Sequence, residues 1–360
     1  DPRPPLIGAH RGASALAPEN TLVAFRTAKA LGADGIEMDV QMTKDKKLVI
    51  AHDFVTDRVS NAHYDIFDTD FETLRQLDFG SWHSPDYAGE KIPTLEEVLE
   101  IGRDMKMIHI ELKPYFDRDK DFVARVLDTV LEMGCVDNTV ITSFQYDLLR
   151  QVKEQMPQIK TAALFLNMES THFPPPSLWE DLGLTNGGTL PETFPQTFRE
   201  ALELAQDPDA LDGENGPANP LFQYYRDRFL AMCSNYPGQN LLEILQDYFY
   251  QIDLPRYVSQ FDFPIDYIGP TYYGCFRDPK LVSKIQEMGF AAAPWPMFLE
   301  NRRELRSLLK MQPEVIVTNQ PELLRSVIEA QKSGQEPADV DDLPLTNPEA
   351  LAAGQLPENS

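Results

Sequence analysis

The sequence predicts an α/β barrel of eight parallel strands, because apolar runs of strand length alternate with amphipathic helical segments. Eight strand–helix units match a (β/α)8, or TIM, barrel. We expect one such domain over residues 1–332, with a small insertion at about 54–92, a larger helical insertion at about 168–264 and an acidic, proline-containing tail at 333–360. The expected strands end near His10, Asp39, Lys113, Ser143, Leu166, Thr271, Trp295 and Thr318.

The composition is that of a large globular protein with an acidic surface. The 360 residues are 42% hydrophobic, and the net charge of -25 argues against a nucleic-acid partner. An anionic substrate would bind only where a metal and a few cations reverse the local field. No apolar run is long enough for a transmembrane helix. The sequence leaves open the oligomeric state and the compartment, which is cytoplasmic, or secreted or periplasmic with a leader removed.

The first expected strand, residues 6–9, ends in His10 and Arg11. Polar residues at the carboxyl ends of barrel strands are where active sites are built. A helix follows, and either Asn20 or Thr21 is its expected N-cap. Glu19, just before this cap, fits a role in the cap and a role in a site equally well.

The second expected strand carries two carboxylates, Glu37 and Asp39, that share a face because they are two residues apart. A polar turn near Asp45 and a short apolar run lead to His52. A β-hairpin would bring this imidazole level with the two acids. The alternative is an exposed hairpin with a solvated acidic face.

The segment from residue 54 to residue 92 lacks sustained periodicity and is rich in aromatic residues. It is expected either to lie over the site and cover a small ligand, or to pack its rings on the barrel. The rings are those of Tyr64, Phe67, Phe71, Phe79, Trp82 and Tyr87.

A third telling strand runs from Met107 to Lys113 and places Glu111 and Lys113 on one face. A third carboxylate beside Glu37 and Asp39 would complete an all-oxygen site for Ca²⁺ or Mg²⁺. Lys113 would offer a positive charge to a phosphate oxygen. His109 shares this alternation and is expected to support the site or to pack beside it.

The barrel pattern breaks after the fifth strand, where three helical patterns lie around residues 195–206, 219–234 and 238–252. It resumes near residue 265. We expect the tail after residue 333 to be disordered or loosely draped, because it is acidic and contains several Pro and Gly residues.

The polar groups at the strand ends are those that phosphodiester cleavage needs. A divalent cation polarises phosphoryl oxygens, cations neutralise transition-state charge, and two imidazoles exchange protons with the attacking and leaving groups. No phosphate-binding P-loop, GxGxxG, HExxH or GxSxG motif is present. The converging groups are His10, Arg11, Glu37, Asp39, His52, Glu111 and Lys113.

The stretches "HRGASALAPENTLVAF", "GADGIEMDVQMTKDKKLVIAHD", "IPTLEEVLE" and "IELK" resemble motifs of the glycerophosphodiester phosphodiesterases. The resemblance implies a TIM barrel that hydrolyses glycerophosphodiesters to sn-glycerol 3-phosphate and an alcohol. It implies an acid–base pair of His10 and His52, and phosphate contacts from Arg11 and Lys113. It implies the metal ligands Glu37, Asp39 and Glu111.

Two positions depart from the family's pattern. The family usually has a "WTVN"-like segment where this chain has Trp295-Pro296-Met297, and an Asp where this chain has Asn319. Trp295 is expected either to stack on the glycerol, as a substrate-binding residue, or to pack at the barrel rim.

Two other functions compete with this reading. One is a phospholipase D-like enzyme acting on lysophospholipid or sphingomyelin, with an apolar lip from residues 54–92 and 219–262. The other is a non-catalytic binding protein on the same barrel. The presence of all the polar groups favours an enzyme, although a fold alone does not fix an activity.

Overall fold

The computed structural model describes residues 3–113, 120–165, 254–259 and 261–345. The chain divides into two units, residues 1–165 with 260–345 and residues 166–259 with 346–360. The second unit is described only in helix α10 (Leu254–Ser259). The three helical patterns expected within 195–252, and the tail after residue 345, therefore lie outside the described residues.

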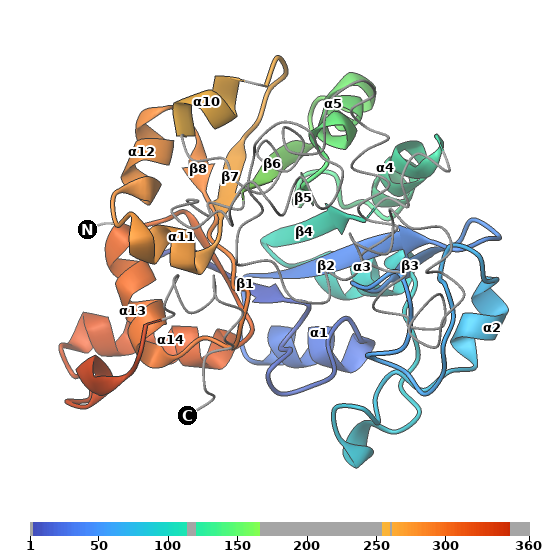
Figure 1. Ribbon diagram of the computed structural model, residues 1–360, viewed down its shortest axis with the longest axis horizontal. Helices are drawn as coiled ribbons and strands as arrows, with labels where there is room; N and C mark the ends of the chain where they lie inside the picture. The colour runs from blue at the N-terminus through green and yellow to red at the C-terminus, as the bar shows by residue number, and fades with distance from the viewer. Residues whose placement is uncertain (1–2, 114–119, 166–253, 260, 346–360) are drawn as a thin grey trace, which may run out of the picture. The chain divides into compact units, whose positions relative to one another are not determined.

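The first unit is built on a nearly closed barrel of eight parallel strands, in the order β8-β7-β6-β5-β4-β2-β1-β9 (Figure 1). Backbone hydrogen bonds join the two end strands, from Glu314 N to Ala292 O at 3.2 Å and from Val317 N to Pro294 O at 3.0 Å. The predicted fold class is thus confirmed. The strands are β1 (Leu6–His10), β2 (Gly35–Met42), β4 (Met107–Leu112), β5 (Thr139–Ser143), β6 (Lys160–Phe165), β7 (Tyr267–Pro270), β8 (Ala291–Ala292) and β9 (Val315–Thr318).

Helices follow the strands as the pattern predicts, and several of them begin with a side-chain cap. Thr21, rather than Asn20, is the N-cap of α1 and accepts a hydrogen bond from Ala24 N at 3.3 Å. Thr94 and Glu97 form a capping box at the start of α3. Caps of this kind stabilise a helix by about 1 kcal/mol. The helices are α1 (Leu22–Ala30), α3 (Leu95–Gly102), α4 (Phe122–Glu132), α5 (Tyr146–Gln155), α11 (Tyr272–Arg277), α12 (Leu281–Glu287), α13 (Arg302–Met311) and α14 (Pro321–Ser333).

The predicted hairpin is present, and β3 (Leu48–Ile50) pairs antiparallel with β2. The turn is closed by a hydrogen bond from Thr43 N to Lys47 O at 2.9 Å. Its residue Lys46 takes a left-handed backbone conformation with a φ of 62°. The return strand therefore runs back toward the end of the barrel that holds Asp39, whose carbonyl oxygen accepts from Ala51 N at 3.0 Å.

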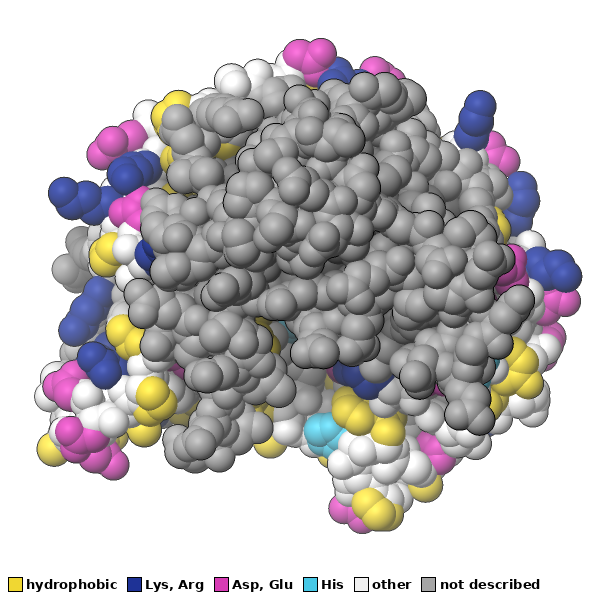
Figure 2. Space-filling model, viewed as in Figure 1, with side chains coloured by type: hydrophobic (Ala, Val, Ile, Leu, Met, Phe, Trp, Pro, Cys, Tyr) yellow, Lys and Arg dark blue, Asp and Glu magenta, His cyan; other side chains and the backbone are white. Residues whose placement is uncertain are grey.

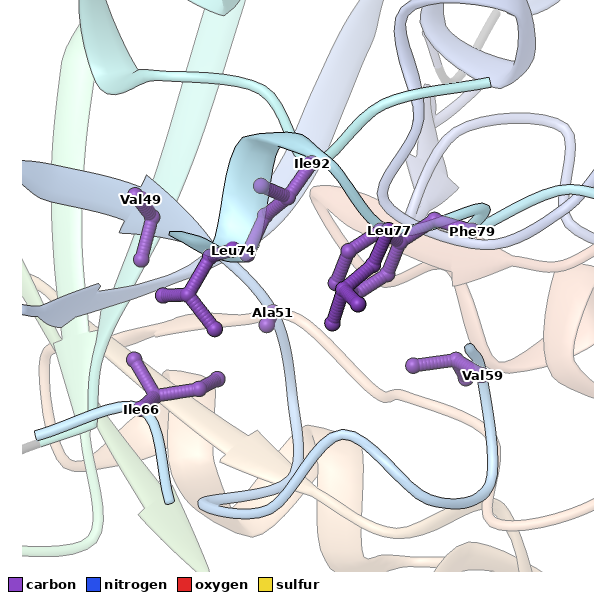
Figure 3. Packing of buried hydrophobic residues seen from close by; sticks show 8 residues of the cluster. All are labelled: Val49, Ala51, Val59, Ile66, Leu74, Leu77, Phe79 and Ile92. Carbon is purple, nitrogen blue, oxygen red and sulfur yellow. The ribbon is translucent and has the colours of Figure 1, made fainter. Parts of the chain in front are cut away.

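Residues 54–92, which include helix α2 (Phe71–Arg75), form a small second hydrophobic core with side chains of the hairpin. Buried side chains from β3, α2 and the loops converge there (Figure 3), and Tyr64 and Phe71 pack at its edge. The ring of Phe79 therefore lies in this core and those of Tyr64 and Phe71 pack against it, as the second of the two alternatives for this segment predicts. The buried residues are Val49, Ala51, Val59, Ile66, Leu74, Leu77, Phe79 and Ile92.

The described part of the tail, residues 334–345, packs against α13, which differs from the loosely draped tail that we expected. Val340 is only 2% exposed, and Arg303 Nη1 donates to Leu343 O at 2.7 Å. Arg306 binds Glu336 at 2.9 Å and also pairs with Asp341. Two acids of the tail are therefore paired with one arginine of α13, an interaction that the composition of the tail does not reveal.

The described surface is charged with both signs. Basic and acidic side chains are interspersed around the visible periphery (Figure 2). Among the described residues, no helix has both the length and the apolar character needed to cross a membrane.

Candidate active site

Strand register brings the three carboxylates together. Glu37 on β2 pairs with His10 on β1, and Asp39 pairs with Glu111 on β4. Side chains two residues apart in a strand share a face, so all three acids point into the same end of the barrel. One oxygen from each of Glu37, Asp39 and Glu111 lies within 4.8 Å of the others, and all three residues are buried. This is the convergence that the sequence predicts.

The electrostatics of this carboxylate cluster fit a bound cation. Burial and the neighbouring acids raise the pKa of Glu37 well above its usual range. Burial also raises the pKa of Glu111, whereas Lys113 and Arg11 hold that of Asp39 below its usual range despite burial. Asp39 Oδ1 is buried and accepts no hydrogen bond from the described residues. Three converging carboxylates with an unsatisfied oxygen are the donor set of a hard divalent cation.

Arg11 is held at the cluster by an unusual backbone. Its φ of 56° is left-handed, and its N–H donates to Glu37 Oε2 at 3.0 Å. Its guanidinium Nε lies 3.5 Å from Asp39 Oδ2. Gly12 follows with a φ of 82°, where a Cβ would lie 2.6 Å from the Ala24 backbone. Glycine is therefore required for this turn.

Lys113 stands on the other side of the cluster. Its Nζ lies 2.7 Å from Glu111 Oε1 and 3.9 Å from Asp39 Oδ1. The same ammonium lies 6.0 Å from the centre of the Phe144 ring, within the range of a cation–π contact. Arg11 and Lys113 thus approach different oxygens of Asp39, Oδ2 and Oδ1.

His10 joins the cluster to the last strand. Its Nδ1 lies 2.7 Å from Asn319 Oδ1, and its Nε2 lies 3.8 Å from Glu37 Oε2. Burial and the nearby Arg11 charge lower the pKa of His10 to about 3. The ring is therefore neutral at pH 7.

His52 is placed by the end of the hairpin. Its Nδ1 lies 2.6 Å from Asp53 Oδ1, and Gln41 Nε2 donates to both Ala51 O and Asp53 O at 2.7 Å. Burial, Arg11 and Lys113 lower its pKa to about 4. These electrostatic interactions indicate that His52 lies at the same barrel end as the carboxylates.

For Glu19, which fitted a cap and a site role equally well, the structure shows the second: it binds Arg11 at 3.0 Å. Other residues at the site were not expected there. Arg58, from the aromatic-rich segment, binds both Glu19 and Asp53. Asn20 donates to Asp39 Oδ2 at 3.0 Å. The adjacency of Asp53 to His52 was a usable signal, whereas nothing in the sequence marks Arg58.

Trp295 and His109 pack near the site. Trp295 Nε1 donates to Gly269 O at 2.7 Å, and its ring meets Phe144 edge-on at 5.6 Å. It also packs against a buried cluster that includes Val317. The rim-packing interpretation describes these contacts, and stacking on glycerol stays a prediction. His109 is 3% exposed and meets Tyr267 edge-on, as a packing residue does.

Sequence comparisons point to one family. The model of the glycerophosphoryl diester phosphodiesterase family matches residues 10–179. A glycerophosphodiester phosphodiesterase of Caldanaerobacter subterraneus subsp. tengcongensis is 40% identical over 161 residues, which span 44% of this chain and 66% of that protein. One from Bacillus altitudinis is 36% identical over 45% of this chain and 67% of its own length. The match thus spans about two thirds of these relatives.

Solved structures share the fold. A phosphodiesterase of Oleispira antarctica, in complex with the product sn-glycerol-3-phosphate, aligns over 91% of this chain and 97% of its own with a TM-score of 0.60 and 20% identity. A glycerophosphodiester phosphodiesterase of Agrobacterium tumefaciens aligns over 89% of this chain and 99% of its own with a TM-score of 0.55 and 18% identity. Taken with the sequence matches, these likenesses show that the chain belongs to the glycerophosphoryl diester phosphodiesterase family.

Proposed function

We propose that this protein hydrolyses glycerophosphodiesters to sn-glycerol 3-phosphate and an alcohol. The observation that carries the proposal is the placement of three carboxylates, two imidazoles and two cations at one barrel end. The family to which the chain belongs supports it, as does the related fold of the Oleispira antarctica enzyme, whose structure holds sn-glycerol-3-phosphate.

Glu37, Asp39 and Glu111 would hold one divalent cation, Ca²⁺ or Mg²⁺. Such an ion supplies Lewis-acid polarisation of the phosphoryl oxygens. Arg11 and Lys113 would bind the remaining phosphoryl oxygens and neutralise the charge that grows on them in the transition state. The carboxylates that flank these cations keep both of them oriented toward the cluster.

The two histidines would exchange protons with the substrate. His10 faces a neutral amide, which favours the neutral ring, so it would remove the proton from the attacking hydroxyl. His52 would protonate the leaving alkoxide. The Asp53 carboxylate favours its imidazolium, and a phosphate bound to Arg11 and Lys113 would offset the two charges that, together with burial, lower its pKa. Acid–base assistance of this kind contributes about 10²–10⁴-fold. Trp295 would border the glycerol.

The direct test is release of sn-glycerol 3-phosphate from glycerophosphocholine, with Mg²⁺ or Ca²⁺ added and with the metal removed by chelator. We expect release to require the ion and to be lost in the His10→Ala and His52→Ala variants. Cleavage of lysophospholipid or sphingomyelin with no cleavage of glycerophosphocholine would favour the phospholipase D-like alternative. Binding without turnover of either substrate would favour a non-catalytic barrel.

A further inference from the structure

The amide of Asn319 has a single orientation that satisfies its neighbours. Its Nδ2 lies 2.9 Å from Glu300 Oε2 and 3.3 Å from the carbonyl oxygen of Phe298, which can only accept. Its Oδ1 accepts from Ser14 Oγ at 2.9 Å. The nitrogen therefore faces Glu300, and the oxygen faces His10 Nδ1 at 2.7 Å.

This orientation decides where the proton of a neutral His10 sits. An amide oxygen can only accept, so Nδ1 must carry the hydrogen. The lone pair is then on Nε2, the nitrogen that lies 3.8 Å from Glu37 Oε2. His10 thus presents its basic nitrogen to the carboxylate cluster.

Glu300 is an unusual residue to find behind Asn319. It is only 4% exposed and makes no ion pair with any described residue. Its Oε1 accepts from Thr318 Oγ1 and, at 3.1 Å, from Gln320 N, which precedes helix α14. A buried carboxylate without a cation is costly, so an apolar residue here would serve packing better.

We propose that Glu300 is a positioning residue that holds the Asn319 amide in one orientation and thereby keeps the His10 proton on Nδ1. The inference rests on the proposed function, in which Nε2 of His10 removes a proton. The relay runs from Glu300 through Asn319 to His10 and uses only hydrogen bonds between described side chains. A purely structural alternative is that Glu300 serves only Thr318 and Gln320 at the start of α14.

The variant Glu300→Gln separates these two readings. The new amide can keep its oxygen toward Thr318 and Gln320, as a structural role requires. Its NH₂ group then faces Asn319 Nδ2, and two donors oppose each other. Rotation of the Asn319 amide relieves this clash at the cost of its 3.3 Å contact with the Phe298 carbonyl oxygen, and it turns an N–H toward His10 Nδ1, which moves the imidazole hydrogen to Nε2.

The readout is the tautomer of His10, measured by ¹⁵N NMR with histidine-selective labelling. The His10 signal is assigned by its loss in His10→Ala, and spectra are taken at about pH 8, above the ordinary His pKa of about 6.5. We expect Nδ1–H in the native protein and Nε2–H in Glu300→Gln. An Nε2–H ring in the native protein would overturn the proposal, whatever the substrate proves to be.

Kinetics on glycerophosphocholine give the second readout. Glu300→Gln is expected to lower kcat about 10²-fold or more with KM unchanged, because acid–base assistance is worth about 10²–10⁴-fold. In the double variant Glu300→Gln with Asn319→Asp, the new carboxylate offers an acceptor to His10 Nδ1. The amide at position 300 can then donate to that carboxylate. We expect the double variant to recover most of kcat and the Nδ1–H tautomer.

The matched control is Glu304→Gln. Glu304 is also 3% exposed on α13, and its carboxylate closes a capping box by accepting from Asn301 N at 3.1 Å. Its change should lower thermal stability while leaving the tautomer and kcat unaltered. Unchanged kcat and tautomer in Glu300→Gln, or a double variant no better than the single one, would show that Glu300 is structural. If Glu300→Gln does not fold, the double variant carries the test, and an Nε2–H ring in the native protein would still overturn the proposal.

Discussion

Arg58 binds the carboxylate of Glu19 in a bidentate manner, with hydrogen bonds from Nη1 to Oε1 at 2.7 Å and from Nη2 to Oε2 at 2.9 Å. Glu19 in turn binds Arg11, so the aromatic-rich segment is linked through one carboxylate to the arginine that we propose to bind phosphate. Burial would raise the pKa of Glu19, but Arg11 and Arg58 lower it to about 2. The pair is therefore fully charged at neutral pH.

Arg58→Gln should reduce activity more than stability. Without Arg58, Glu19 and Asp53 lose a shared partner, so we expect kcat/KM to fall about 10-fold, a loss of about 1.4 kcal/mol in transition-state binding. Its side chain is partly exposed, so the stability loss should stay below about 1 kcal/mol. Arg75→Gln is the matched control, because Arg75 grips Glu97 in the same two-bond manner away from the carboxylate cluster. Equal kcat/KM losses in both variants would contradict a link to the site.

Asp53→Asn should impair proton donation by His52. The carboxylate that stabilises the imidazolium is replaced by a neutral amide, so we expect kcat to fall about 10²-fold with little change in KM. The pair of His63 and Asp57 has the same 2.6 Å geometry on the surface and supplies the control. Asp57→Asn should leave kcat unchanged. If Asp53→Asn kept the native kcat, the proposal that His52 acts as the general acid would be wrong.

Metal binding should be visible as stability, independent of turnover. An ion that binds only the folded state at 100 times its dissociation constant adds about 2.7 kcal/mol. We expect Mg²⁺ or Ca²⁺ to raise the Tm of the native protein and to leave that of Glu37→Gln nearly unchanged. The variant should also be at least as stable as the native protein without metal, because one of three crowded carboxylates has gone. An equal Tm response in both proteins would exclude Glu37 as a ligand.

The ion pair between Arg75 and Glu97 should make the free energy of unfolding depend on pH below about 4.5. Hydrogen bonds from Arg75 lower the pKa of Glu97 from 4.5 to about 2. The unfolded chain binds this proton more readily, so the contribution is complete above about pH 4.5 and is lost as the pH falls toward 2. The difference in unfolding free energy between native protein and Glu97→Gln should therefore shrink over this range. A constant difference would contradict the assigned pair.

The sequence predicts the barrel and the carboxylate cluster because both depend on local patterns. Period-two alternation places Glu37 and Asp39 on one face, and parallel pairing aligns Asp39 with Glu111. The hairpin that carries His52 needs only a turn of a few residues. Such features are determined by residues that are close in sequence or in adjacent strands.

The supporting residues depend on contacts between distant parts of the chain and could not be predicted in this way. Arg58 lies in a segment without periodicity, and its contacts with Glu19 depend on how that segment packs on its own apolar core. The link from Glu300 through Asn319 to His10 spans the two ends of the barrel sequence. Of the supporting residues, Asn319 was noticed beforehand as a departure from the family's usual residue, whereas Arg58 and Glu300 were not.

The pairing of β1 with β9, the first strand of the barrel with the last, determines when the surroundings of His10 are complete. The ligands Glu37, Asp39 and Glu111 come from strands made early in translation, whereas Asn319 is made last among the groups that touch His10. A nascent chain that stops before the end of β9 lacks Asn319, the hydrogen-bond partner of His10 Nδ1. The proposed proton transfer by His10 therefore requires the end of the last strand, so nearly the whole barrel must be made before the proposed reaction can occur.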